Sequence, residues 1–328
     1  MPNHQHWQRP LSAMPAAMPV VVLIAALLAG CGGGGGGSST APTSNIQPST
    51  LPQQPGAPSF TGNTALDGYN WINYRRAQLG LSVLARNGQV DAAAQGHSDY
   101  LRLNNTVTHE QTAGAPGFTG VNLADRLSAA GYGLTGGYAI GEVISATPNT
   151  SGFYQAEELI TAVYHRFVMF EPVFKEVGTG ATTAAGNYTY FTADLTARNG
   201  LGAGIGAGRL VNYPANNQTD VPTSFSSDTE SPDPVPDQNV VGYPISVHAD
   251  SGRGGGGVVV RSFTVAPRGG NALSARLLSS ATDSRTTASA AAIIPLAPLR
   301  AATVYDVSFD GTVGGVATTR TWSFTTTR

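Results

Sequence analysis

The amino-acid sequence predicts a layered α+β domain followed by an all-β sandwich. Helical periodicity runs through residues 65–105, and strand-like runs then mix with further helical stretches as far as residue 197. A sheet covered by helices is the usual outcome of such a mixture. From residue 238 to 328, short runs rich in Val, Ile and Thr are separated by Gly, Pro and Asp, which is typical of an antiparallel β-sandwich.

The first domain is expected to contain four helices and three strands. Residues 65–105 hold two helices joined at Gly80-Leu81-Ser82. In the second helix, His97 shares a face with Val90 and Leu101, so we interpret it as a buried core histidine. Further helices are predicted at 120–130 and 154–167, and strands at 137–145, 176–184 and 186–197.

The C-terminal part, residues 238–328, is expected to consist of short strands. The runs that predict them are 240–249, 258–267, 272–280, 291–299, 303–315 and 319–326. The stretch "TVYDVSFDGTVGG" followed by "TWSFTT" resembles a bacterial Ig-like module, which implies a spacer or adhesive role. Before it, the Pro-rich residues 206–237 predict a linker that leaves the two folded regions independent.

The N-terminal residues predict export and lipid anchoring. An apolar run from Met18 to Cys31 is too short to span a bilayer comfortably and reads as part of a signal peptide. It ends in Leu28-Ala29-Gly30-Cys31, which resembles a bacterial lipoprotein box with Cys31 as the lipidated residue. An ordinary signal peptide with a chance Cys, or a short anchor helix, is the alternative. Residues 1–31 are therefore the predicted lipoprotein signal, and 32–61 a flexible Gly/Ser/Pro tether.

The amino-acid composition limits which partners and cofactors the protein can be expected to bind. The chain is 41% hydrophobic and only 12% charged, with a formal net charge of −2. The sequence contains no basic patch, so we do not expect the protein to bind nucleic acid. Cys31 is the only cysteine, so the rest of the chain can form no disulfide and offers no thiolate to a metal. We expect a monomer, held to a membrane by its N-terminal lipid, in the periplasm or at the surface of a bacterial cell.

Eight short motifs follow one another in the first domain. They are Asn73-x-x-Arg76, Gly80-Leu81-x-x-Leu84, Ala94-x-x-His97, Thr108-His109, Arg126-x-x-x-x-Gly131-Tyr132, Gly141-Glu142, His165-Arg166 and Val177-Gly178. In this order and at these spacings they resemble the CAP superfamily of cysteine-rich secretory proteins, antigen 5 and plant pathogenesis-related proteins, in its cysteine-free bacterial branch. The resemblance covers roughly residues 64–200. It implies an α-β-α sandwich, for a domain that we place at residues 62–205.

The resemblance also implies a site. The family is defined by a cleft lined by two histidines and two glutamates, and His109, Glu142 and His165 match three of these positions. The second glutamate has no secure match. Glu157 and Glu158 are candidates, and Glu158 lies seven residues before His165, nearly on the same helical face.

We hypothesise that His109, Glu142 and His165 converge in one cleft. Two imidazoles and a carboxylate could hold a divalent metal such as zinc with one open position, or could act as general acid and base. No cofactor is predicted with certainty. The neighbouring polar residues are interpreted as solvated or strand-end positions: Tyr164, Glu171 and Asp194.

Three functions stay open. The first is binding of a lipid, glycan or peptide ligand through the His/Glu-lined cleft of an envelope lipoprotein. The second is metal-assisted or acid/base hydrolysis of a peptide or envelope substrate. The third is interaction with a host or another cell, with a vestigial cleft. No Ser or Cys stands in a recognisable nucleophile context, so we favour binding and leave enzymatic activity open.

Overall fold

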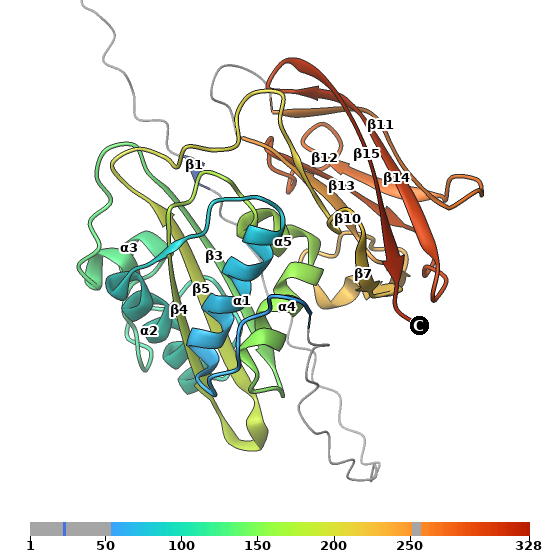
Figure 1. Cartoon of the computed structure of the whole chain (residues 1–328). Helices are drawn as coiled ribbons and strands as arrows, with labels where there is room; N and C mark the ends of the chain where they lie inside the picture. Colours follow the sequence, from blue (N-terminus) through green and yellow to red (C-terminus); the bar gives the residue numbers. More distant parts are fainter. Residues whose placement is uncertain (1–21, 24–53, 251–256) are drawn as a thin grey trace, which may run out of the picture.

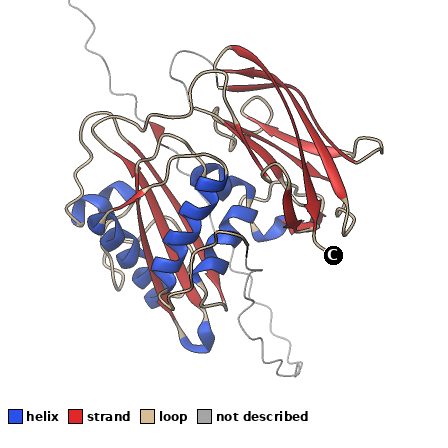
Figure 2. Cartoon of the chain, viewed as in Figure 1, coloured by secondary structure: helices blue, strands red, loops and turns tan. Residues whose placement is uncertain are grey.

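The computed structural model of the chain describes residues 22–23, 54–250 and 257–328 (Figure 1). The predicted lipidation site, Cys31, lies outside the described residues. The N-terminal half is a sheet between two helical layers, and the C-terminal half is built of strands (Figure 2). Within the described ranges, no helix is long and apolar enough to cross a membrane.

The first helices form where the periodicity predicts them. Each begins after an Asn whose side chain accepts hydrogen bonds from the first helical turn: Asn63 for α1 (Thr64–Gln78) and Asn87 for α2 (Gly88–Asn104). Soon after α1 the chain turns at Gly80, whose φ of 75° suits glycine. α3 (Leu123–Ala129) starts with a capping box.

The N-terminal sheet has five strands in the order β1-β3-β5-β4-β2. Their bounds are Val22–Leu23 for β1, Ala85–Arg86 for β2, Ala139–Thr147 for β3, Glu176–Thr183 for β4 and Thr189–Ala197 for β5. The three long central strands are mutually antiparallel, and the two short outer strands pair in parallel. β1 belongs to the predicted signal run, so cleavage before Cys31 would remove it.

Successive side chains of a strand point to opposite faces of the sheet, and each face is covered by a layer of helices. Two glycines on β4, Gly178 and Gly180, let α2 lie directly on one face of the sheet. A Cβ added at Gly178 would lie 2.1 Å from the α2 backbone, and one added at Gly180 would lie 2.2 Å from it. α1, α4 (Gly152–Thr161) and α5 (Val163–Met169) belong to the other layer (Figure 1). Glu142 on β3 faces α2, whereas its neighbour Val143 lies in the core beneath α1 and α4.

The helix predicted at 154–167 is interrupted. Ala162 has extended backbone angles, with φ of −67° and ψ of 119°, so α4 ends before it and α5 begins after it. No Pro or Gly marks this break. Instead, the carboxylate of Glu230 accepts hydrogen bonds from the backbone N–H groups of Val163, Tyr164 and His165, which stabilises a new helix start.

The C-terminal half contains two four-stranded sheets and a two-stranded ribbon, in the orders β12-β13-β10-β6, β11-β14-β15-β7 and β8-β9. The strands are β6 (Val211–Tyr213), β7 (Gln218–Val221), β8 (Ser224–Ser226), β9 (Val240–Gly242), β10 (Ile245–His248), β11 (Val258–Pro267), β12 (Ala275–Ser279), β13 (Ala290–Pro295), β14 (Val304–Val313) and β15 (Val316–Thr326). Each predicted run beyond residue 238 contains a strand. The pairing is antiparallel except between β7 and β15.

The expectation of two independent regions is wrong. The Pro-rich residues 206–237 contribute β6, β7 and β8 to the C-terminal sheets and the ribbon. One hydrophobic core joins the halves, because Phe170 after α5 belongs to the same buried cluster as Ile245 and Val247 of β10. Arg166 of α5 crosses the same boundary, since it donates to the Pro244 carbonyl at 2.7 Å. Proline cannot donate a hydrogen bond to a neighbouring strand, so the prolines of this stretch rule out long strands but leave room for short ones between them.

Candidate functional site

The candidate site is centred on Glu142, a buried carboxylate on β3. One of its oxygens, Oε1, lies 2.8 Å from Nδ1 of His109, in the loop after α2. The other, Oε2, lies 2.6 Å from Nη2 of Arg126 on α3. The second Nη group of Arg126 donates to the backbone carbonyl of His109 at 2.9 Å. Arg126 therefore fixes both the carboxylate and the backbone that carries the imidazole.

His109 is the accessible member of this group. Its side chain is 16% exposed, compared with 4% for Glu142 and 0% for Arg126. Because a carboxylate can only accept, Nδ1 of His109 carries the proton of their hydrogen bond. The other ring nitrogen, Nε2, has no hydrogen-bond partner among the described residues. The imidazole is thus oriented by one nitrogen and leaves the other free for a ligand, a water molecule or a proton.

Charges around Glu142 keep it ionised. Burial alone would raise its pKa, but the Arg126 guanidinium, His97 and His109 outweigh burial and hold the pKa of Glu142 below its ordinary range. A carboxylate that stays charged at neutral pH is a strong acceptor for the Nδ1–H group of His109.

The prediction that His97 is a buried core histidine is confirmed. It is fully buried, its Nε2 donates to the Thr108 carbonyl at 2.8 Å, and its Nδ1 accepts from Nε2 of Gln111 at 2.9 Å. Both ring nitrogens are therefore satisfied by one neutral tautomer. Burial is the main cause that lowers the pKa of His97 to about 4. Its role is to hold the loop that carries His109.

The prediction of solvated positions is wrong for three polar residues. Tyr164, Glu171 and Asp194 are all buried. Asp194 lies opposite Glu142 in the register of β5 and β3, and burial together with the charge of Glu142 raises the pKa of Asp194 well above its ordinary value. Burial and the neighbouring carboxylate therefore both favour the neutral form of Asp194. Strand alternation could have revealed it, because Tyr190, Thr192 and Asp194 point to one face.

His165 lies in a different setting. It is on α5, in the other helical layer, and its Nδ1 is 3.0 Å from Oε1 of Glu230. Glu230 comes from outside the predicted 62–205 domain, in a Pro-rich stretch that gave no sign of a buried acid. The structure pairs His109 with Glu142 and His165 with Glu230, and no hydrogen bond links the two pairs among the described residues.

The proposed metal ligands are not assembled. In the part of the chain that the structure describes, no group of three or more His, Cys, Asp or Glu side chains is placed to hold a metal ion. His165 is hydrogen-bonded to Glu230 and not to Glu142, so the zinc site of His109, Glu142 and His165 stays a prediction. A hydrogen bond at Nδ1 leaves Nε2 of either histidine able to bind a ligand.

Neither candidate for the second glutamate joins Glu142. Glu157 forms a bidentate ion pair with Arg75 at 2.9 Å and also accepts from the Trp71 indole and the Tyr213 hydroxyl. Glu158 accepts from the Ser145 hydroxyl at 2.5 Å. Burial raises the pKa of Glu158, while Ser145 and nearby His165 oppose that shift.

Residues 69–195 match the Cysteine-rich secretory protein family, CAP, so the chain carries a CAP-family domain at those positions. Among solved structures, it is similar to an extracellular protein containing an SCP domain from Bacillus anthracis, with 22% identity and a TM-score of 0.35. The match covers 44% of this chain and 44% of that one, so the chain spans less than half the length of that protein.

Two other solved structures are similar over a smaller part of this chain. An outer surface protein from Borrelia burgdorferi has 14% identity and a TM-score of 0.34, over 40% of this chain and 90% of that one. A venom allergen-like protein from Schistosoma mansoni has 9% identity and a TM-score of 0.28, over 40% and 86%. The search of curated proteins found no match.

Proposed function

We propose, from the CAP-family domain that this chain carries, that the protein is a lipid-anchored envelope or surface protein which binds a ligand at His109. The anchor is Cys31, at the end of the apolar run from Met18, and residues 32–61 are the tether that holds the domain off the membrane. The C-terminal half is an Ig-like module in this proposal. Its shared core with the CAP-family half supports a rigid spacer.

One observation carries the binding proposal: a buried, ionised carboxylate orients a partly exposed imidazole whose second nitrogen has no hydrogen-bond partner among the described residues. A side chain held in this way loses little further freedom when a ligand arrives, which favours recognition. Nε2 of His109 can donate to or accept from a polar group, depending on its protonation. The ligand is a lipid headgroup, a glycan or a peptide, because each offers such a group.

Acid/base hydrolysis is the second candidate. A carboxylate hydrogen-bonded to Nδ1 of a histidine is the orienting half of a catalytic triad, so His109 and Glu142 have the geometry of a general base and its positioning group. A triad also needs a nucleophile on Nε2. No Ser, Thr or Cys among the described residues is hydrogen-bonded there, so catalysis would need an activated water molecule.

The test uses the full-length protein in detergent micelles. Three probes are titrated, each followed by calorimetry: a short-chain phosphatidylglycerol, a chitotetraose and a peptidoglycan stem peptide. We expect one class to bind, and His109→Ala to weaken it about tenfold or more, as loss of a hydrogen bond to a charged group does. Glu110→Gln is the matched control, because Glu110 is an exposed neighbour in the same loop.

The outcomes separate the candidates. Equal binding by the wild type and His109→Ala would overturn the proposed site. Mass spectrometry of the same mixtures detects cleaved probe, and cleavage that disappears in both His109→Ala and Glu142→Gln would establish hydrolysis instead. For the anchor, wild-type cells should incorporate labelled palmitate into the protein, and cells with Cys31→Ser should not.

A further inference from the structure

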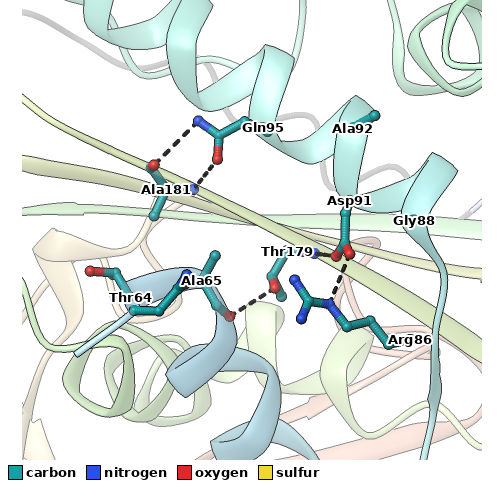
Figure 3. Close-up of a pocket in the computed structure, with 10 residues that line it drawn as sticks. Thr64, Ala65, Arg86, Gly88, Asp91, Ala92, Gln95, Thr179 and Ala181 are labelled. Carbon is teal, nitrogen blue, oxygen red and sulfur yellow. Dashed lines mark hydrogen bonds and ion pairs between the residues drawn. The ribbon is translucent and has the colours of Figure 1, made fainter. Parts of the chain in front are cut away.

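A polar groove of about 550 Å³ opens along the edge of the N-terminal sheet (Figure 3). The N-terminal turns of α1 and α2 form its walls, with Thr64 and Ala65 on one side and Asp91 and Gln95 on the other. Its floor is β4. The groove is distinct from the His109 site, since Glu142 lies two strands away across the sheet order β3-β5-β4.

The floor of the groove is an unpaired strand edge. β2 pairs with β4 only at Glu176 and Val177, and among the described residues no strand continues beyond them. Farther along, the backbone N–H of Thr179 donates to Oδ1 of Asp91 at 2.8 Å. The backbone N–H of Thr179 thus points toward the groove rather than toward β5.

Side chains imitate the missing strand. Oε1 of Gln95 accepts from the N–H of Ala181 at 3.0 Å, and Nε2 of Gln95 donates to the carbonyl of Ala181 at 3.2 Å (Figure 3). The Gln95 amide therefore makes the pair of bonds that the N–H and C=O of one residue in an antiparallel neighbouring strand would make. The glutamine and aspartate are flexible side chains, so a real strand can displace them and replace each hydrogen bond.

Arg86 supplies the charge that selects an occupant. Its side chain is 40% exposed, and its Nε donates to Oδ2 of Asp91 at 2.8 Å. Its two Nη groups have no hydrogen-bond partner among the described residues. Asp91 is already engaged by Arg86 and by Thr179, so the free guanidinium donors are available to a carboxylate from outside.

We propose that this groove binds an extended peptide that carries a carboxylate. The peptide adds to β4 as a strand beside Thr179 and Ala181, and its carboxylate binds the Nη groups of Arg86. Open strand edges accept such strands through backbone hydrogen bonds, while a charged pocket sets the sequence preference. Gly88 and Ala92 at the rim leave room for the side chains of the peptide.

The test uses full-length protein in detergent micelles and an array of random decapeptides, each made with a free C-terminal carboxylate and with a C-terminal amide. Comparing the two forms distinguishes a terminal carboxylate from an acidic side chain. Peptides that bind are resynthesised with N-methyl groups on alternate residues, which removes the donors of a strand. Affinities are measured by fluorescence anisotropy, and hydrogen exchange follows the amides of Thr179 and Ala181.

We expect Arg86→Gln and N-methylation each to weaken binding about tenfold or more. Ala92→Trp should abolish binding by filling the groove, whereas Leu103→Trp, at an exposed position near the other end of α2, should not. His109→Ala should leave the affinity unchanged, which separates this proposal from the function proposed above. Exchange at Thr179 and Ala181 should slow when the peptide binds.

Three results with peptides would overturn the proposal. In the first, no peptide binds in a way that Ala92→Trp removes. In the second, the N-methylated peptides bind as tightly as the unmethylated ones. In the third, the peptides bind the Arg86→Gln variant as tightly as the wild type. A chitotetraose that binds in place of peptide, with the same sensitivity to Arg86→Gln, would identify a saccharide site and also overturn it. If Ala92→Trp fails to fold by circular dichroism, the N-methyl and Arg86→Gln measurements still decide.

Discussion

Two histidine–glutamate pairs in this molecule have nearly the same bond, but their carboxylates have different further partners. Nδ1 to carboxylate distances are 2.8 Å for His109–Glu142 and 3.0 Å for His165–Glu230. Glu142 has its second oxygen on Arg126, and its histidine is partly exposed. Glu230 also binds three backbone N–H groups at the start of α5. Both carboxylates are buried, and the side chain of His165 is 10% exposed, compared with 16% for His109.

The difference shows that a His–Glu pair has no fixed role. In the first pair, the guanidinium of Arg126 neutralises the carboxylate and also holds the backbone that carries the imidazole. In the second, the carboxylate satisfies the donors of a helix start, and the imidazole is one more donor in that cap. What else the carboxylate binds decides whether the pair also holds the start of a helix.

The largest effect is expected at the buried pair. Glu230→Ala leaves the N–H groups of Val163, Tyr164 and His165 buried without partners, so we expect the free energy of unfolding to fall by about 3–5 kcal/mol. Urea unfolding of the full-length protein measures it. Asp228→Ala is the control, because this exposed carboxylate should change stability by less than about 0.5 kcal/mol. Equal losses in the two variants would contradict the cap.

The next effect tests the clamp on Glu142. Arg126→Met removes the main counter-charge of a buried carboxylate, so we expect a loss of about 2–4 kcal/mol and a rise in the pKa of Glu142. Arg261→Met removes an exposed ion pair with Asp310 and should cost less than about 1 kcal/mol. Calorimetric unfolding compares the two. A smaller loss for Arg126→Met than for Arg261→Met would show that the clamp is dispensable.

A third prediction concerns acid stability. The pKa of His97 is about 4 in the folded protein and ordinarily 6.5, so between these values the unfolded chain binds a proton that the folded one does not. Stability is therefore complete above pH 6.5 and falls as the pH drops toward 4, by about 1.4 kcal/mol per pH unit for this group. Unfolding curves from pH 7 to 4.5 should show a shallower decline in His97→Gln. Parallel declines would mean that His97 does not titrate in this way.

The smallest effect on stability is expected at His109. His109→Ala removes a partly exposed ring and leaves Glu142 bound to Arg126, so we expect a loss of about 1 kcal/mol or less. His165→Ala removes a buried donor from Glu230 and should cost more than His109→Ala. Thermal unfolding of both variants measures the order. A reversed order would contradict the larger structural role that the Glu230 bond gives to His165.

Much of the fold could be predicted because its signals are local. Asn63 and Asn87 cap the first two helices at the residues where periodicity begins, and Gly80 follows the end of the first. The alternation of β5 and the Val-rich runs of the C-terminal half likewise mark strands from neighbours in the chain. The pairing of His109 with Glu142 came from a resemblance in motif order, and hydrogen bonding supports it.

By itself, the sequence predicted most of the helices and the long strands, and it placed His109 and Glu142 among the three residues expected to converge with His165. Only the tertiary structure decided that a helix breaks at Ala162, that His165 belongs to Glu230 and that the two halves share a core. The His165–Glu230 bond joins residues 65 positions apart, across a Pro-rich stretch. A break without Pro or Gly is decided by a distant carboxylate, because a helix start needs partners for its N–H groups and no nearby residue supplies them here.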